Sequence, residues 1–219
     1  MTVRIERIDA ASPDSRILRR AARLIAKGEV IVCPTDTGYA FSANALDIKA
    51  VARVFNLKGR SYFNPIHVAV SSIEEAGKYA HVNEAARRLA SRFLPGALTL
   101  VLPKREIIPA MLVGGRDTVG IRIPNNRIIL SLVEMAVVPL TTTSANISGR
   151  PTPYSVEEVV NQLGEDIEKV AMILNQGMLS TRELSTIVDL TVSPPQLIRR
   201  GLISWREIRE VLKRLHGSG

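Results

Sequence analysis

Polar side chains crowd residues 141–151 (TTTSANISGRP), which hold five hydroxyls, one carboxamide, one glycine and one arginine but no carboxylate. Such a stretch offers many hydrogen-bond donors and a fixed positive charge, which suits a phosphate or a carboxylate ligand. Ser, Asn, Gly and Pro are also ordinary turn residues, so a solvated turn is the alternative. Taken alone, the stretch is better explained as a turn. A binding site requires partners elsewhere in the chain.

Further polar groups lie at the ends of apolar runs that we expect to be strands. They are residues 34–37, residues 58–65, Thr118 with Arg122, Ser185 with Thr186, and residues 199–201. Most have a structural explanation: Asp36 suits a turn that accepts backbone amides, and Lys58 and Arg60 suit the C-terminal end of a helix dipole. Arg122 lies among apolar neighbours, where a buried guanidinium needs partners. Because ligands of α/β folds usually bind beyond strand ends, these groups together predict an anion pocket.

Several absences narrow the chemistry. The chain has no G-x-x-x-x-G-K-[ST] loop, no G-x-G-x-x-G fingerprint and no G-x-S-x-G nucleophile elbow. The single cysteine, Cys33, has no evident histidine partner, and it excludes an internal disulfide and a cysteine-based zinc site. The three histidines are too widely spaced to suggest a metal cluster. The chemistry implied is positioning and charge stabilisation, without a covalent enzyme intermediate.

Alternating helix and strand patterns position these loops. Apolar spacing and capping residues predict helices over residues 12–28, 47–58, 72–80, 83–93, 126–134, 155–163 and 204–215, the first with Ser12 as its N-cap. Apolar runs predict strands over residues 30–33, 66–70, 97–102, 119–123, 136–140, 171–174, 186–190 and 196–199. Residues 103–118, with two prolines and two adjacent glycines, suggest a mobile loop. We therefore expect one compact α/β domain over residues 1–219, with a partly mixed sheet.

The overall charge favours anionic partners. Lysine and arginine outnumber aspartate and glutamate 29 to 21, which gives the 219-residue chain a net charge of +8. Nucleotides, nucleic acids and acidic small molecules all fit this charge, but the 4% aromatic content argues against extensive base-stacking platforms. The start of the chain lacks the apolar core of a secretory signal, and no apolar run is long enough to span a bilayer. A cytoplasmic protein without membrane contact is expected.

Five motifs occur in order between about residues 15 and 203. They are residues 34–39 (PTDTGY), residues 58–60 with 64–65, residues 93–96 with Thr99, residues 119–124, and residues 143–149 (TSANISG). Together they resemble the YrdC/Sua5 family. The resemblance implies a single YrdC-like domain, a twisted, largely open mixed α/β sheet with flanking helices and a basic concave face.

The resemblance also implies an activity. Active members of the family are threonylcarbamoyl-AMP synthases, nucleotidyltransferases that combine L-threonine, bicarbonate or CO2, and ATP into threonylcarbamoyl-adenylate and pyrophosphate. This reaction is the first step of the t6A37 modification of tRNA, which a downstream t6A transferase of the TsaD/Kae1 type completes. L-Threonine, ATP, bicarbonate and that transferase are therefore the partners that the resemblance implies, and tRNA or double-stranded RNA is a further candidate partner.

Residue roles follow from the same resemblance. The implied L-threonine contacts are Thr35, Arg122, Ser144 and Ser185. The implied ATP contacts are Lys58, Arg60, Asn64, Thr118, Asn146 and Arg199. We expect Arg122 to bind the threonine carboxylate, and Lys58 and Arg60 to act on the phosphates as catalytic residues, because guanidinium forks suit both groups. Mg2+ is expected to be bound through the ATP phosphates, and no residue is assigned as a metal ligand.

Three features depart from the family pattern. Ala69 stands where many members have a histidine, and His67 is interpreted as a core residue of its strand and left out of the site. Tyr154 stands where some relatives have a small hydroxyl residue, so it is given no nucleotide contact. Few residues follow the predicted helix over 204–215, so we expect a short form without the additional C-terminal domain of long members.

Two other functions remain as alternatives. A non-catalytic module that binds double-stranded RNA, tRNA or the ribosome would share the fold and the basic face. A carbamoyl-transfer enzyme is the third hypothesis, because the same domain occurs in hydrogenase-maturation proteins. Fold resemblance alone does not separate the three. The presence of both the threonine set and the nucleotide set favours the synthase.

Overall fold

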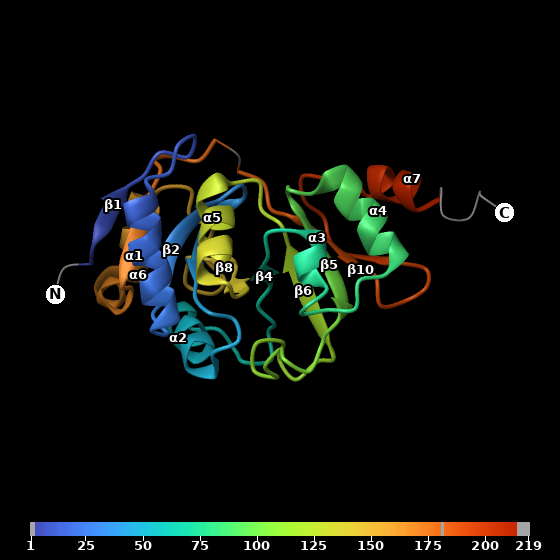
Figure 1. Ribbon diagram of the computed structural model, residues 1–219, viewed down its shortest axis with the longest axis horizontal. Coiled ribbons are helices and arrows are strands. Elements are labelled where there is room, and N and C mark those ends of the chain that lie inside the picture. The colour runs from blue at the N-terminus through green and yellow to red at the C-terminus, as the bar shows by residue number, and fades with distance from the viewer. Residues whose placement is uncertain (1–2, 181, 214–219) are drawn as a thin grey trace.

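Two mixed sheets lie side by side along the long axis of the molecule, with helices packed over them (Figure 1). This computed structural model describes residues 3–180 and 182–213. The first sheet has the strand order β1-β9-β2-β3-β8 and the second the order β11-β10-β5-β6-β4-β7. The strands are β1 (Ile5–Arg7), β2 (Ile31–Thr35), β3 (Gly38–Ser42), β4 (Val68–Ala69), β5 (Leu98–Pro103), β6 (Thr118–Arg122), β7 (Leu140–Thr141), β8 (Thr143–Ser144), β9 (Met172–Asn175), β10 (Thr186–Asp189) and β11 (Gln196–Arg199).

The helices begin at the capping residues that the sequence predicts, with one exception. They are α1 (Ser15–Ala26), α2 (Ile48–Lys58), α3 (Ile73–Ala76), α4 (Glu84–Phe93), α5 (Arg127–Ala136), α6 (Val156–Leu163) and α7 (Trp205–Lys213). A 3-10 helix, Gly164–Lys169, comes directly after α6. Asp47, Asn83 and Ser155 cap α2, α4 and α6. Ser12 does not cap α1, because Asp14 takes that role and accepts a hydrogen bond from Arg16 N at 2.7 Å. The end of the predicted helix over 204–215 lies outside the described residues.

The predicted strand over residues 136–140 is wrong over most of its length. Helix α5 continues to Ala136 and ends at Val137, whose backbone is left-handed (φ 57°) and whose side chain is 77% exposed. Strand pairing begins only at Leu140. A left-handed helix end normally carries glycine or asparagine, so the apolar composition of this stretch hides it. The predicted strand 66–70 and helix 72–80 are likewise shorter, as β4 and α3.

A hairpin of β2 and β3 is the main element that the sequence does not predict. β2 continues beyond Cys33, and Pro34 pairs with Tyr39 and Thr35 with Gly38. All five residues of β3 are buried, so its pattern lacks the alternation that identifies a half-exposed strand. Gly38 has φ +140°, and a Cβ atom there would overlap the Thr152 side chain. The start of β3, directly after the turn residues Asp36 and Thr37, is thereby held against residues 152–153, where Tyr39 N donates to Pro153 O at 2.9 Å.

Backbone hydrogen bonds join the two sheets. Thr141 N donates to Ala43 O at 2.9 Å, and Ala45 N donates to Pro139 O at 3.0 Å, on either side of an isolated bridge between Asn44 and Leu140. The predicted α/β class with a mixed, open sheet and flanking helices is confirmed, with the strands divided between two sheets. Residues that follow β7 therefore enter the crevice between the sheets.

The interior consists of a large core and a smaller one. The smaller core lies between α1, α5 and the strands β2 and β9, with Leu18, Leu132 and Met172 among its members. The larger core extends through both sheets and includes three residues of the predicted mobile loop, Ile108, Leu112 and Val113. The loop over residues 103–118 is thus anchored by buried side chains. Within residues 3–180 and 182–213, none of the helices has the length and apolar character of a membrane span.

Candidate functional site

A cavity of about 260 Å3 lies where the two sheets meet. Its walls come from the β2–β3 hairpin, the end of α2 and the loop after it, β6, residues 142–152, and the segments around residues 184–185 and 199. Most of the predicted site residues line it: Thr35, Lys58, Arg60, Arg122, Ser144, Asn146, Ser185 and Arg199. Residues that are far apart in the sequence are thus brought together as the anion-pocket hypothesis requires.

Asn64 and Thr118 are not among the residues that line the cavity. Thr118 opens strand β6 and pairs with Pro103, whereas Arg122 closes the same strand at its other end. Asn64 is exposed, and its backbone oxygen accepts a hydrogen bond from Arg60 Nε at 3.1 Å. Their ATP contacts stay predictions.

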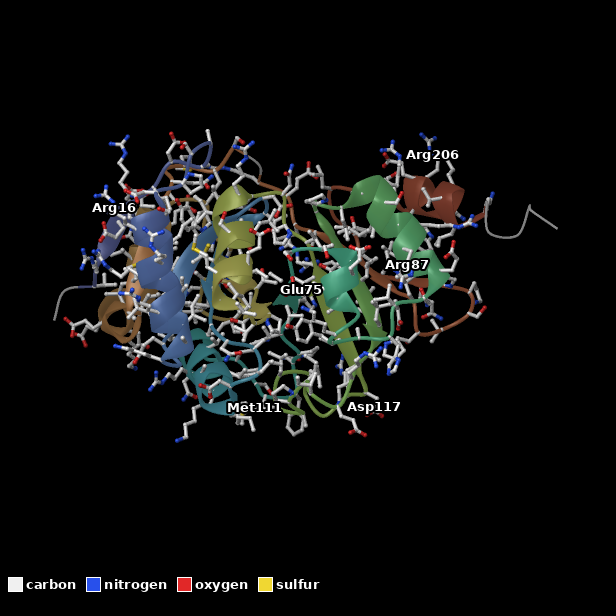
Figure 2. All side chains as sticks on the ribbon, viewed as in Figure 1. Arg16, Glu75, Arg87, Met111, Asp117 and Arg206 are labelled. Atoms are coloured by element: carbon white, nitrogen blue, oxygen red, sulfur yellow. The ribbon has the colours of Figure 1, made fainter. Side chains whose placement is uncertain are left out.

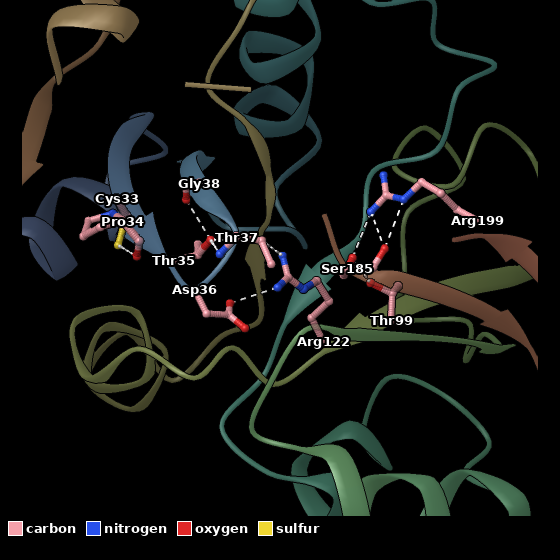
Figure 3. A network of polar contacts seen from close by, with 10 residues as sticks. All are labelled: Cys33, Pro34, Thr35, Asp36, Thr37, Gly38, Thr99, Arg122, Ser185 and Arg199. Atoms are coloured by element: carbon pink, nitrogen blue, oxygen red, sulfur yellow. Dashed lines mark hydrogen bonds and ion pairs between the residues drawn. The ribbon is translucent and has the colours of Figure 1, made fainter. Parts of the chain in front are cut away.

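Arg122 is held by the hairpin turn (Figure 3). Its Nη2 donates to Asp36 Oδ1 at 2.9 Å, and its Nη1 donates to Thr37 Oγ1 at 2.9 Å. Arg122 is 5% exposed, and its Nε and Asp36 Oδ2 are both buried without a hydrogen-bond partner among the described residues. Burial lowers the pKa of the guanidinium and the Asp36 carboxylate opposes that effect. Asp36, interpreted from the sequence as a turn residue, is therefore also the counter-ion of Arg122.

The Thr35 and Ser185 hydroxyls already have protein partners (Figure 3). Thr35 Oγ1 donates to Gly38 O at 2.7 Å and accepts from Thr37 N at 3.1 Å. Ser185 Oγ lies 2.9 Å from Thr99 Oγ1 and accepts from Arg199 Nη2 at 2.9 Å. These bonds fix the direction of each hydroxyl in the cavity wall.

Lys58 ends α2 in a cage of oxygen atoms, with 2% of its surface exposed. Its Nζ donates to Ser144 O at 2.6 Å and Ser144 Oγ at 3.1 Å, and to the backbone oxygen of Asn146 at 3.3 Å. The Asn146 side-chain oxygen is a further acceptor. Burial, with a smaller effect of neighbouring Arg60, lowers the pKa of Lys58 to about 7. A bound anion would favour the charged form.

Asn146 connects Lys58 to the turn that follows. Its side-chain oxygen accepts from Lys58 Nζ, while its side-chain nitrogen donates to Arg150 O. Ser148 N also donates to Lys58 O at 2.7 Å. The turn therefore lies against the cavity, and Gly149 and Arg150, which the sequence leaves unassigned, line its wall. Gly149 is the last residue of the 143–149 motif and Arg150 follows it directly, which is the signal that could have included them.

Arg60 and Arg199 line the cavity with part of their donor capacity unused. Nε and Nη2 of Arg60 donate to Asn64 O and Pro65 O, both at 3.1 Å. Nε and Nη2 of Arg199 donate to Ser185 O at 3.1 and 2.9 Å. Burial lowers the pKa of both guanidinium groups. Because these acceptors, and the Ser185 hydroxyl that Arg199 also contacts, are uncharged, the charge of each guanidinium remains available to an anion.

His67, interpreted from the sequence as a core residue outside the site, lies just before β4 and also lines the cavity. Burial and the neighbouring charges of Arg199, Arg122 and Arg60 lower the pKa of its imidazole to about 3. The ring is therefore neutral near pH 7, so one of its nitrogens donates a hydrogen bond and the other accepts one. The ring packs against Gly120 of β6.

Alanine at position 120 is expected to displace the His67 ring towards the cavity. A Cβ atom on Gly120 would lie 3.0 Å from His67 Cγ and closer still to Cδ2. We expect the Gly120→Ala variant to lose about 1–3 kcal/mol of stability, the usual effect of overpacking. Thermal denaturation measures this loss. The double variant Gly120→Ala/His67→Ala lacks the obstructing ring and should be more stable than Gly120→Ala alone. Equal losses of stability in the single and the double variant would show that the ring is not the obstacle.

A family model and a curated relative both match most of the chain. The model of the Sua5/YciO/YrdC family, described as telomere recombination, matches residues 23–201. A threonylcarbamoyl-AMP synthase from Pyrococcus abyssi is 41% identical over 196 residues, which cover 89% of this chain and 57% of that protein.

Two solved structures extend the comparison to the fold. P. abyssi Sua5 complexed with L-threonine matches with a TM-score of 0.89 and 38% identity, over 97% of this chain and 61% of that chain. E. coli YciO matches with a TM-score of 0.83 and 28% identity, over 93% of this chain and 98% of that chain. This chain thus spans less than two thirds of the P. abyssi protein but nearly the whole of YciO. The chain belongs to the Sua5/YciO/YrdC family.

Proposed function

We propose that this chain is a threonylcarbamoyl-AMP synthase, which forms threonylcarbamoyl-adenylate and pyrophosphate from L-threonine, bicarbonate and ATP. One observation carries the proposal: cations and hydroxyls of both expected ligand sets line a single cavity, and no carboxylate of the described residues lines it. Such a lining suits an amino-acid carboxylate beside a triphosphate. The names of the P. abyssi relative and of its L-threonine complex support it.

The cavity suggests how the reaction proceeds. Arg122 takes the carboxylate of L-threonine, and the threonine amine condenses with bicarbonate, releasing water, to give a carbamate. A carbamate oxygen then bonds to the α-phosphorus of ATP while the bond from that phosphorus to the bridging oxygen breaks, and pyrophosphate leaves with the electron pair. Lys58, Arg60 and Arg199 stabilise the negative charge of the phosphates. The protein positions the two substrates and needs no covalent intermediate.

The donor chemistry of the cavity also fits the expected Mg2+. No group of three or more His, Cys, Asp or Glu residues that could hold a metal occurs among residues 3–180 and 182–213. The lining supplies cations, hydroxyls and the Asn146 carboxamide, whose oxygen already accepts from Lys58. Mg2+ commonly keeps several waters and binds through substrate phosphates, where it neutralises phosphate charge. We propose that ATP brings it into the cavity.

Pyrophosphate release from ATP tests the proposed activity. The purified chain is expected to release pyrophosphate only when L-threonine and bicarbonate are both present, and threonylcarbamoyl-adenylate should be detectable by mass spectrometry. Omission of either substrate is the control for unrelated ATP hydrolysis. Release that does not depend on L-threonine would refute the synthase proposal. We further propose that a t6A transferase consumes the product.

A non-catalytic RNA-binding module is the second candidate. The observation that favours it is the outer surface, where Arg16 of α1, Arg87 of α4 and Arg206 of α7 are exposed (Figure 2). These side chains suit a polyanion because no cavity restricts access to them. A salt-sensitive affinity for tRNA that ATP and L-threonine leave unchanged, together with no threonine-dependent turnover, would support this candidate over the synthase.

A further inference from the structure

The positive charge of the cavity is unevenly compensated. Its cationic lining residues are Lys58, Arg60, Arg122, Arg150 and Arg199. Within the described residues, an ion pair with a carboxylate is found at one of them, Arg122, whose Nη2 lies 2.9 Å from Asp36 Oδ1. The side chains of this pair are 7% and 13% exposed, so solvent screens their attraction much less than at the surface. Arg122 is thus the one of these cationic residues whose charge is offset by a carboxylate among the described residues.

The same hairpin turn makes a charged and an uncharged contact with Arg122. Asp36 supplies the carboxylate, and the next residue, Thr37, supplies a hydroxyl that accepts from Nη1 at 2.9 Å (Figure 3). The second carboxylate oxygen, Asp36 Oδ2, is buried without a partner of its own among the described residues. The negative charge of Asp36 therefore acts on Arg122. Two effects on Arg122 can therefore be separated by changing one residue at a time: Asp36 offsets its charge, and Thr37 orients it without charge.

We propose that Asp36 sorts the two substrates, by neutralising Arg122 so that this arginine accepts the carboxylate of a zwitterion and not a phosphate group. This inference rests on the proposed function. L-Threonine has no net charge, so its binding beside an ion pair costs little electrostatic free energy. A polyphosphate is instead drawn to Arg60 and Arg199, and its negative charge favours the ammonium form of Lys58. Without the Asp36 charge, Arg122 becomes another phosphate site of the fork geometry that guanidinium groups favour. Asp36 is a positioning residue in this scheme.

Binding of L-threonine and inorganic pyrophosphate tests the sorting without turnover. Calorimetric titration of the wild-type chain is expected to show one pyrophosphate per chain, and saturating pyrophosphate should change the L-threonine Kd by less than about twofold. In Asp36→Asn, which keeps the shape but not the charge, pyrophosphate should raise the L-threonine Kd by about tenfold or more. The Asp36→Asn variant is also expected to bind a second pyrophosphate per chain when L-threonine is absent.

Thr37→Val is the matched control. It removes the uncharged contact to Arg122 and keeps the carboxylate, so it should weaken L-threonine binding without making pyrophosphate competitive. Asp36→Glu keeps the charge and should resemble the wild type in the competition. A folded Asp36→Asn protein without competition would overturn the proposal.

The wild-type chain alone can also overturn the sorting, which matters if Asp36→Asn does not fold. Pyrophosphate that competes with L-threonine in the wild type contradicts the proposal directly. If the wild type binds no L-threonine, the proposed function fails. The number of pyrophosphates bound per chain then tests the role of Asp36 by itself: equal numbers in the wild type and in Asp36→Asn overturn it.

Discussion

Replacing Arg60 with alanine is expected to lower threonine-dependent pyrophosphate release by about 10²- to 10³-fold, the range found when a charge-stabilising donor is removed from an active site. Nε and Nη2 of Arg60 donate to the carbonyls of Asn64 and Pro65, which orient the side chain. The guanidinium lines the cavity and has no carboxylate partner among the described residues. Its charge is therefore free to act on the phosphates. Initial rates at saturating ATP, L-threonine and bicarbonate measure the loss.

Arg53→Ala provides the control, from helix α2, which ends two residues before Arg60. Arg53 donates to Gly28 O at 2.8 Å and to Glu29 Oε2 at 2.9 Å, and it does not line the cavity. Because exposed ion pairs contribute about 0–1 kcal/mol, this variant should stay folded and retain nearly the wild-type rate. Thermal denaturation of both variants separates loss of activity from unfolding. Full activity of a folded Arg60→Ala variant would show that another group meets the phosphate charge.

The cationic residues of the site are predictable because each lies at a boundary that the sequence marks. Lys58 and Arg60 follow an amphipathic helix, and Arg122 ends an apolar strand, so their positions in an α/β crevice follow from the periodicity. The role of Asp36 is not predictable in this way. Its contact with Arg122 joins residues 86 positions apart, and it depends on a tight turn before β3, whose uniform burial gives no strand signal.

The positions of His67 and Thr118 relative to the cavity depend on the direction of side chains along a strand. β4 has only two residues, too few for alternation to show which way the preceding His67 points. Thr118 and Arg122 occupy opposite ends of β6, about 13 Å apart at a rise of about 3.3 Å per residue. One small cavity at the Arg122 end therefore does not also include Thr118. The structure places both residues on one strand, and only the position of the cavity along that strand separates them.

The affinity of the protein for ATP is expected to fall as the pH rises above about 7, because Lys58 has a pKa lowered to about 7 in the free fold. The neutral amine attracts phosphate less, and a bound phosphate favours the ammonium, so ATP binding must raise this pKa and take up protons. The ATP Kd should rise by up to about tenfold per pH unit in this range. Calorimetric titration near pH 8 in buffers of different ionisation enthalpy measures the uptake, which Lys58→Met should abolish. Equal uptake by both proteins would contradict the assignment to Lys58.

The same pKa determines how Lys58 affects folding. In the unfolded chain the lysine titrates near 10.5 and in the fold near 7, so between these values the unfolded state binds more protons. Stability should therefore rise with pH across this window, since the cost of the buried ammonium is present in full below about pH 7 and vanishes above about 10.5. Urea denaturation at about pH 7 and about pH 9.5 should show the wild type gaining stability relative to Lys58→Met. A constant difference would mean that the oxygens of Ser144 and Asn146 keep the ammonium charged throughout, and in that case ATP affinity would not depend on Lys58 titration either.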